Sequence, residues 1–179
     1  MGGIVVASVY FTLRKWKAED TKSLSEYANN KKIADKLRNV FPHPYTLKDA
    51  EEYINACILA DESKEYCRGI DIEGKAVGSI GIFLRDDVYC KSGELGYWLA
   101  EPFWGKGIMT EAIKQICEIV FEKYDIVRIF AEPYANNMES RRVLEKAGFQ
   151  LEGILRKSVY KNGQLMDSCM YSLIKDTNI

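Results

Sequence analysis

The chain has no excess of positive charge. Its 179 residues include 25 lysines and arginines against 26 aspartates and glutamates, so the formal net charge is −1. Nucleic-acid-binding domains attract phosphate with a basic field, and this composition does not supply one. We therefore do not expect a nucleic acid as a partner.

Histidine and paired cysteine are also scarce. The single histidine is His43, and the five cysteines contain no Cys-x-x-Cys pair. Without a cluster of such ligands we expect no metal site, and an odd number of thiols is typical of the reducing cytoplasm. We interpret all five as small apolar residues, namely Cys57, Cys67, Cys90, Cys117 and Cys169.

Long apolar runs are missing as well. Residues 2–11 are mostly apolar, but no basic residue precedes them and the run is far shorter than the roughly 20 residues that span a bilayer. We therefore expect no membrane association. No repeat or linker divides the chain, so we predict a single domain over 1–179 with its core at about 9–175.

A glycine-bracketed turn is the most informative feature that is present. It follows the apolar segment 95–99, whose strand pairing should end at Pro102, which has no backbone N–H. Gly105 and Gly107 let the backbone approach a ligand closely. The apolar spacing of residues 108–120 predicts a helix whose free N–H groups face this turn. Such a turn favours a bound phosphate.

The turn fits neither common nucleotide pattern. Lys106 lies between the glycines rather than after them, and the third glycine of a dinucleotide motif is absent. The segment resembles the acyl-CoA pyrophosphate loop of the GNAT acetyltransferases, in particular the branch of the RimJ and RimL ribosomal-protein N-acetyltransferases. Trp104 and Met109 depart from the family pattern Arg/Gln-x-x-Gly-x-Gly/Ala but fit a variant within that branch.

A second motif resembles the other half of the GNAT cofactor site. Residues 136–149 contain Asn-x-x-Ser followed by a short helix that ends in Lys-x-Gly-Phe. Asn136 or Asn137 can cap this helix, and Gly148 stands where a left-handed residue commonly ends one. The resemblance extends over nearly the whole chain and includes a Pro-Tyr-Thr segment, where Thr46 should begin another helix.

The pattern and the resemblance together predict an α+β GNAT fold. It has a central, mostly antiparallel seven-stranded sheet, flanked by helices, in which one parallel pair of strands splays apart. Asn-Gly at 162–163 and Glu-Gly at 73–74 predict tight hairpins. Strands are expected near 9–16, 65–71, 76–84, 92–99, 127–132, 150–160 and 165–174, and helices near 20–29, 31–39, 47–60, 109–123 and 137–147.

The resemblance implies acetyl-CoA as cosubstrate. Its pantetheine arm would enter between strands 92–99 and 127–132 and hydrogen-bond like an added strand. The residues predicted to bind pantetheine are Trp98, Leu99 and Ala100; those predicted to hold the pyrophosphate are Lys106, Gly107, Ile108, Met109 and Thr110; Asn137 would orient pantetheine or acceptor, and Lys146 would reach the nucleotide end.

Acetyl transfer to an amine needs a base, a polarised carbonyl and a stabilised thiolate. Glu94 is the first candidate for the base, because strand alternation directs it to the same face as Trp98. Glu132 is the second. By resemblance, Ser140 would contact the departing sulfur and Asn137 would orient the reactants, while a backbone N–H near Trp98 or Leu99 would polarise the carbonyl. The alternative is a solvated Glu94 and two residues that only start a helix.

The acceptor is open. An α-amino group has a pKa near 8 and a lysine amine one near 10.4, so an N-terminal amine demands less of a base. We predict a protein or peptide N-terminus as acceptor, for example that of a ribosomal protein. The alternatives are a small amine, such as a polyamine or aminoglycoside, and a domain that binds acyl-CoA without turnover. The family also makes a homodimer a reasonable expectation.

Overall fold

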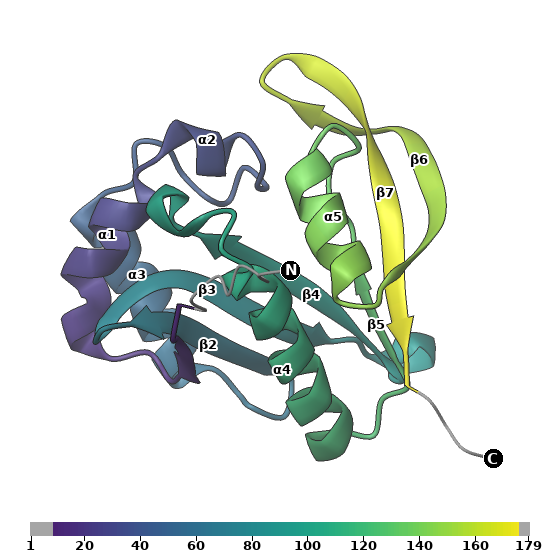
Figure 1. Cartoon of the computed structure of the whole chain (residues 1–179), viewed down its shortest axis with the longest axis horizontal. Coiled ribbons are helices and arrows are strands. Elements are labelled where there is room, and N and C mark those ends of the chain that lie inside the picture. Colours follow the sequence, from purple (N-terminus) through teal and green to yellow (C-terminus); the bar gives the residue numbers. More distant parts are fainter. Residues whose placement is uncertain (1–8, 176–179) are drawn as a thin grey trace, which may run out of the picture.

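The computed structural model describes residues 9–175. Its strands form one seven-stranded sheet in the order β1-β2-β3-β4-β5-β7-β6 (Figure 1), and only the β4–β5 pair is parallel. This confirms the predicted α+β GNAT fold. The strands are β1 Thr12–Arg14, β2 Glu65–Ile72, β3 Lys75–Leu84, β4 Ser92–Leu99, β5 Arg128–Ala131, β6 Gln150–Lys161 and β7 Gln164–Ile174.

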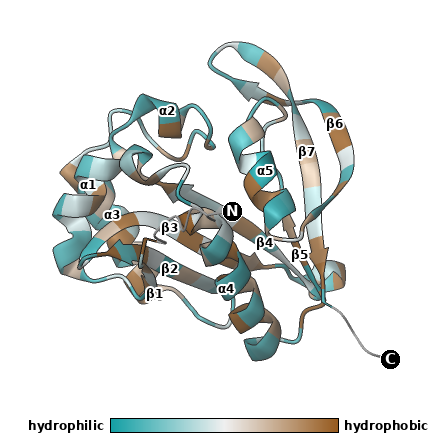
Figure 2. Ribbon diagram, viewed as in Figure 1, coloured by the Kyte–Doolittle hydropathy of each residue, from teal (hydrophilic) through white to brown (hydrophobic). Residues whose placement is uncertain are grey.

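Helices cover both faces of the sheet. Figure 1 shows α4 and α5 in front of it and α3 behind. The strand β4 packs against both layers, because Leu95 and Leu99 join the core under α4 while Trp98 joins a second cluster with α1 and α3. The outward side of α5 is mostly hydrophilic (Figure 2). The helices are α1 Thr21–Ala28, α2 Lys31–Ala34, α3 Leu47–Leu59, α4 Ile108–Lys123 and α5 Met138–Lys146.

Both predicted hairpins are confirmed. Glu73 and Gly74 have φ of 52° and 81°, and Asn162 and Gly163 have φ of 52° and 76°. Two consecutive positive φ values are the requirement of the tight turn that matches the twist of antiparallel strands. These turns set the registers of β2 with β3 and of β6 with β7.

Two predicted elements are shorter than expected. The first strand covers only Thr12–Arg14 of the predicted 9–16, and the helix predicted over 31–39 ends at Ala34. Beyond Ala34 the backbone forms turns, with the Lys36 and Leu37 N–H groups bonded to the Ile33 and Ala34 carbonyls, and long-range contacts are added to them. Tyr134 Oη donates to the Leu37 carbonyl at 3.0 Å, and Lys161 Nζ donates to Asn39 Oδ1 at 3.0 Å. Segment 35–39 is therefore shaped by its contacts with the C-terminal half of the chain.

Candidate active site

The parallel strands β4 and β5 separate after three pairs of residues. Ser92, Gly93 and Glu94 pair with Arg128, Ile129 and Phe130, and β5 ends one residue later. Strand β4 continues to Leu99, so its last five residues keep only β3 as a neighbour within the described sheet. The predicted splayed pair is confirmed, and it leaves a backbone edge that an extended ligand can use.

Alternation of the β3–β4 ladder decides which backbone groups face this gap. The Ala100 N–H donates to the Val77 carbonyl at 2.8 Å, so it is turned toward β3. In the observed register the backbone of Trp98, opposite Ser79, faces β3 as well. This orientation does not favour the pantetheine contacts predicted for the backbone of Trp98 and Ala100, which faces β3 instead of the gap.

The groups that face the gap belong to Tyr97 and Leu99. The sequence analysis did not select Tyr97. Its position two residues from both Leu95 and Leu99 indicates that the three side chains share one face of β4. The Leu99 carbonyl also accepts a hydrogen bond from Trp104 Nε1 at 2.6 Å. This bond ties the glycine turn to the end of β4, so Trp104 is an anchor of the loop and not only a packing residue.

The glycine turn has the geometry of an anion site. Gly105 and Gly107 have φ of 72° and 75°, values that L side chains rarely adopt, and a Cβ on either would meet no atom within 4 Å. The first hydrogen bond inside α4 runs from the Glu111 N–H to the Gly107 carbonyl. The amides of Ile108, Met109 and Thr110 therefore have no partner within the helix. These residues bury their side chains and present only backbone to the turn, while Lys106 lies 5.4 Å from the Phe103 ring centroid.

Asn137 and Ser140 meet Tyr97 at the start of α5. Asn137 caps the helix by accepting from the Ser140 N–H at 3.3 Å, which confirms the predicted cap. Ser140 Oγ lies 2.6 Å from Tyr97 Oη. Burial raises the pKa of Tyr97 well above its ordinary value, and the bond to Ser140 offsets this only in part. The phenol therefore stays protonated and can donate to Ser140, leaving the serine proton free to point elsewhere.

Glu94 is clamped by two arginines. Arg38, from the segment after α2, contacts Glu94 Oε1, and Arg85 Nη1 lies 3.5 Å from Glu94 Oε2. The carboxylate side chain is only 17% exposed. Both of its oxygens are therefore engaged by cations, which compete with any incoming amine for the same lone pairs.

Glu132 lies one residue past the end of β5 and has a different environment. Its Oε1 accepts a hydrogen bond from Ser168 Oγ at 2.6 Å. Among residues 9–175, no lysine, arginine or histidine nitrogen lies within 4.0 Å of this carboxylate. Glu132 is half-buried and has a neutral partner, so it can accept a proton without first breaking an ion pair.

The two carboxylates and the Tyr97–Ser140 hydroxyl pair lie on opposite faces of the sheet. Phe130 pairs with both Glu94 and Ser172, so these side chains share the face away from α4 and α5. Ser168 lies on the same face of β7 and brings Glu132 to it. Tyr97 and Ser140 are on the α5 side. The gap between β4 and β5 is therefore reached from two sides, one carrying a carboxylate and the other a hydroxyl pair.

A small hollow continues along the Glu94 face. It has a volume of about 230 Å³ and lies where β4 and β5 begin. Away from this hollow, the β6–β7 turn contacts the segment after α2, where Asn162 Nδ2 donates to Asp35 Oδ1 at 2.9 Å. The hollow is lined by Arg85, Tyr89, Ser92, Arg128, Phe130 and Met170.

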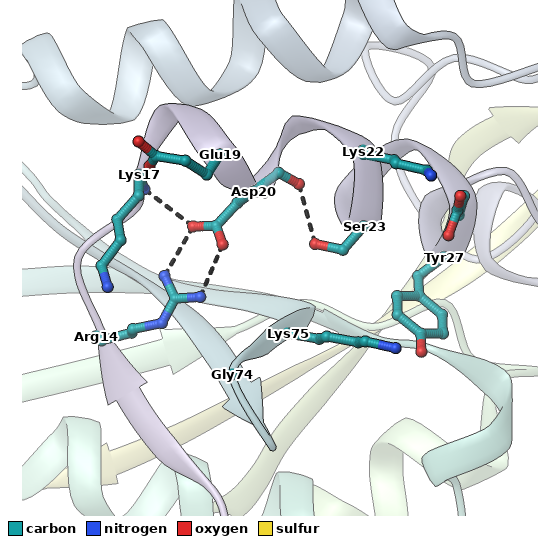
Figure 3. A pocket seen from close by; sticks show the side chains of 10 residues that line it. Arg14, Lys17, Glu19, Asp20, Lys22, Ser23, Tyr27, Gly74 and Lys75 are labelled. Carbon is teal, nitrogen blue, oxygen red and sulfur yellow. Dashed lines mark hydrogen bonds and ion pairs between the residues drawn. The ribbon is translucent and has the colours of Figure 1, made fainter.

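A second hollow lies elsewhere. It has a volume of about 640 Å³ and is lined by η1 Ala18–Asp20, α1 and the β2–β3 turn, with no residue from β4, β5 or α5 (Figure 3). Its central charges neutralise each other, because Arg14 donates to both Asp20 oxygens at 2.7 Å and to Asp71 at 2.6 Å. This arrangement stabilises the β1–α1 connection, and we assign the chemistry to the gap.

Lys146 is separated from the residues that converge on the gap. It is exposed in the last turn of α5, nine residues after Asn137, which is about 13 Å along a helix. The structure thus brings Ser140 and Asn137 to Tyr97 on β4 and ties the glycine turn to Leu99, while Lys146 lies at the other end of α5.

Comparison with known proteins identifies the family. A family model described as an acetyltransferase (GNAT) domain matches residues 11–150. The putative ribosomal N-acetyltransferase YdaF of Bacillus subtilis is 31% identical over 173 residues, which cover 93% of this chain and 92% of that protein.

Two solved structures share the fold. RimL, the ribosomal L7/L12 alpha-N-protein acetyltransferase in complex with coenzyme A, has a TM-score of 0.84 at 23% identity and covers 97% of this chain and 99% of that one. The microcin C7 self-immunity acetyltransferase MccE, in complex with acetyl-CoA and AMP, has a TM-score of 0.80 at 26% identity, with 92% of each chain covered.

The chain therefore belongs to the GNAT acetyltransferase family. It is an acetyl-CoA-dependent N-acetyltransferase, and the cradle of free amides beside an unpaired strand edge fits that cosubstrate. Within residues 9–175, none of the helices combines the length and apolar character needed to cross a bilayer.

Proposed function

We propose that this enzyme acetylates the α-amino group of a protein or peptide N-terminus, with Glu132 as general base. The observation that carries the proposal is the difference between the partners of the two carboxylates. Glu94 is held by two arginines, whereas Glu132 has one neutral partner among residues 9–175. A single modest base suits an amine whose pKa is near 8 better than one near 10.4.

The cosubstrate would lie along β4. The amides of residues 106–110 would hold the pyrophosphate at the positive end of α4, and the backbone of Tyr97 and Leu99 would bond the pantetheine arm. One of the gap-facing N–H groups on β4 would polarise the thioester carbonyl. This arrangement directs the acetyl group toward the point where β4 and β5 separate.

Each side of the gap would then perform one half of the reaction. Glu132 takes a proton from the acceptor amine, whose nitrogen attacks the acetyl carbon and forms the C–N bond. The C–S bond breaks toward the other face, where Ser140 donates a hydrogen bond to the sulfur. Tyr97 Oη lies 2.6 Å from Ser140 Oγ and would orient that hydroxyl by donating to it. Asn137 holds the helix start that carries Ser140.

Glu94 becomes an acceptor-positioning group in this proposal. Its arginine partners, Arg38 and Arg85, line the face from which the amine approaches, beside the small apolar hollow at Phe130. The residues after an acceptor N-terminus would extend across this face. The five unpaired thiols are consistent with a reducing cytoplasm, where ribosomal N-termini are found.

The test is a substrate panel. The protein is incubated with acetyl-CoA and either ribosomal N-terminal peptides, spermidine or an aminoglycoside, and release of free CoA is followed. The proposal expects turnover on peptides that is abolished by prior N-terminal blocking. Turnover confined to spermidine or the aminoglycoside would overturn the acceptor assignment. Acetyl-CoA binding without CoA release on any amine would instead indicate a binding domain.

A further inference from the structure

The Glu132 carboxylate is connected to solvent by two serine hydroxyls. Ser168 Oγ donates to Glu132 Oε1 at 2.6 Å, and Ser158 Oγ lies 2.6 Å from Ser168 Oγ. Ser168 is fully buried, whereas Ser158 is exposed on β6. Ser168 gives its one proton to the carboxylate, and the single Ser158 proton has two acceptors within reach, Ser168 Oγ at 2.6 Å and the Leu155 carbonyl at 3.0 Å.

A bulge in β6 places Ser158 at this point. The pairing of β6 with β7 shifts register between Leu155 and Val159, and Lys157 has φ of 52°. The Lys157 N–H donates to Asp167 Oδ1 at 2.8 Å, and Ser158 Oγ donates to the Leu155 carbonyl at 3.0 Å. Bulges commonly re-aim a side chain at the cost of regular pairing. Here the re-aimed side chain completes the hydroxyl chain.

A neighbouring serine and glutamate show that such a chain is not a general feature of the strand. Ser172, on the same face of β7, donates to Glu152 Oε1 at 2.7 Å. Glu152 is also held by both terminal nitrogens of Arg128 at 2.6 Å, and these contacts lower its pKa to about 2. Glu152 and Ser172 end in an ion pair, whereas Glu132 and Ser168 are followed by a second hydroxyl, on the exposed Ser158.

The proposed reaction releases one proton in each turnover. An ammonium acceptor loses two protons from its nitrogen as it becomes an amide: one ends on the departing CoA sulfur, which leaves as the thiol, and the other ends on Glu132, which must lose it before the next cycle. We propose that Ser168 and Ser158 form a relay that carries this proton from Glu132 to solvent. The inference rests on the proposed role of Glu132 as base.

The transfer is balanced at each atom. Protonated Glu132 gives its proton to Ser168 Oγ while the Ser168 proton passes to Ser158 Oγ and the Ser158 proton passes to water. The carboxylate is restored and one hydronium ion leaves. Rotation of the two hydroxyls then returns the chain to its starting direction.

The test uses full-length variants with ribosomal N-terminal peptide and acetyl-CoA. Ser168→Ala should lower kcat about tenfold with an unchanged KM for acetyl-CoA, since a hydrogen bond to the carboxylate is lost. Ser158→Ala should lower kcat less, and Ser158→Thr, which keeps the hydroxyl, should restore it. Added imidazole should raise kcat of both alanine variants because it accepts the proton directly. Ser172, like Ser168, is buried and lies on the same face of β7, so Ser172→Ala is the control and should show neither a loss of kcat nor a rescue by imidazole.

The outcomes separate the relay from the proposed function. A kcat loss in Glu132→Gln, with Ser158→Ala and Ser168→Ala equal to wild type, would overturn the relay and leave the base in place. Unchanged kcat in Glu132→Gln would overturn the base itself. If Ser168→Ala unfolds at a lower temperature, the exposed Ser158→Ala still decides, because a loss that imidazole does not rescue counts against proton transfer.

Discussion

The glycine turn offers a sharp test of how the cosubstrate is held. Gly107 caps α4 with φ of 75°, and no atom lies within 4 Å of the position where a Cβ would stand. Gly107→Ala therefore creates no clash within the protein. Its effect on folding should come only from the left-handed backbone, which costs an alanine roughly 1–2 kcal/mol. Its effect on binding should be larger, because the new methyl group points into the space proposed for the pyrophosphate.

The chain contains a matched control for the backbone strain. Gly163 in the β6–β7 turn has φ of 76° and likewise has no atom within 4 Å of an added Cβ. Gly163→Ala should lose the same roughly 1–2 kcal/mol, which lowers the melting temperature by about 2–8 °C in a chain of this size. Any further difference between the two variants then reports on the turn at Gly107.

Thermal unfolding with and without CoA measures that difference. At a CoA concentration of 100 times Kd, the wild type and Gly163→Ala should each gain about 2.7 kcal/mol. A tenfold weaker Gly107→Ala should gain only about 1.4 kcal/mol at the same concentration, and titration calorimetry should give the same ratio of Kd values. Equal CoA affinity in Gly107→Ala and Gly163→Ala would refute the assignment of the pyrophosphate to this turn.

Three further predictions concern the gap and the fold. Glu132→Gln should lower kcat by about 10²–10⁴, and Glu94→Gln by less than about tenfold, in initial-rate assays on peptide. Tyr97→Phe should lower kcat up to about tenfold at constant KM for acetyl-CoA, since one neutral hydrogen bond is lost. Burial alone would raise the pKa of Asp20, but hydrogen bonds from Arg14 outweigh it and lower the pKa. Asp20 should thus stabilise the fold above about pH 4, and urea unfolding should show the difference from Asp20→Asn vanish as the pH falls through the lower folded-state pKa.

Most of the fold was predictable because its signals are local. Strand β4 was predicted at its observed bounds, and both hairpins follow from turn residues that accept positive φ. One exception is segment 35–39, where Leu37 continues the apolar spacing of a helix but the backbone adopts turns. Its Leu37 carbonyl is bonded by Tyr134 and its Asn39 by Lys161, and a pattern confined to one segment contains no information on partners about 100 residues away.

The backbone contacts of β4 were predicted less well for a related reason. Sequence alternation indicates which side chains share a face, but it does not indicate which N–H groups point to β3. That choice depends on the register between the strands, which sets Ala100 against Val77. A shift of one residue would have turned Trp98 toward the gap and Tyr97 away from it. The residue that faces the gap could be assigned only once the pairing was known.

The choice of base depends on the same segment that the sequence misjudged. The sequence favours Glu94 over Glu132 as the base, because strand alternation directs Glu94 to the same face as Trp98, whereas Glu132 only follows the end of β5. They differ in their partners: Arg38 comes from segment 35–39, which reaches Glu94 because it leaves the helical path. With that arginine and Arg85 in place, both oxygens of the Glu94 carboxylate are held in ion pairs. Among the described residues Glu132 has a hydroxyl partner and no ion pair, so the contact that ends a helix early also supports Glu132 as the proposed base.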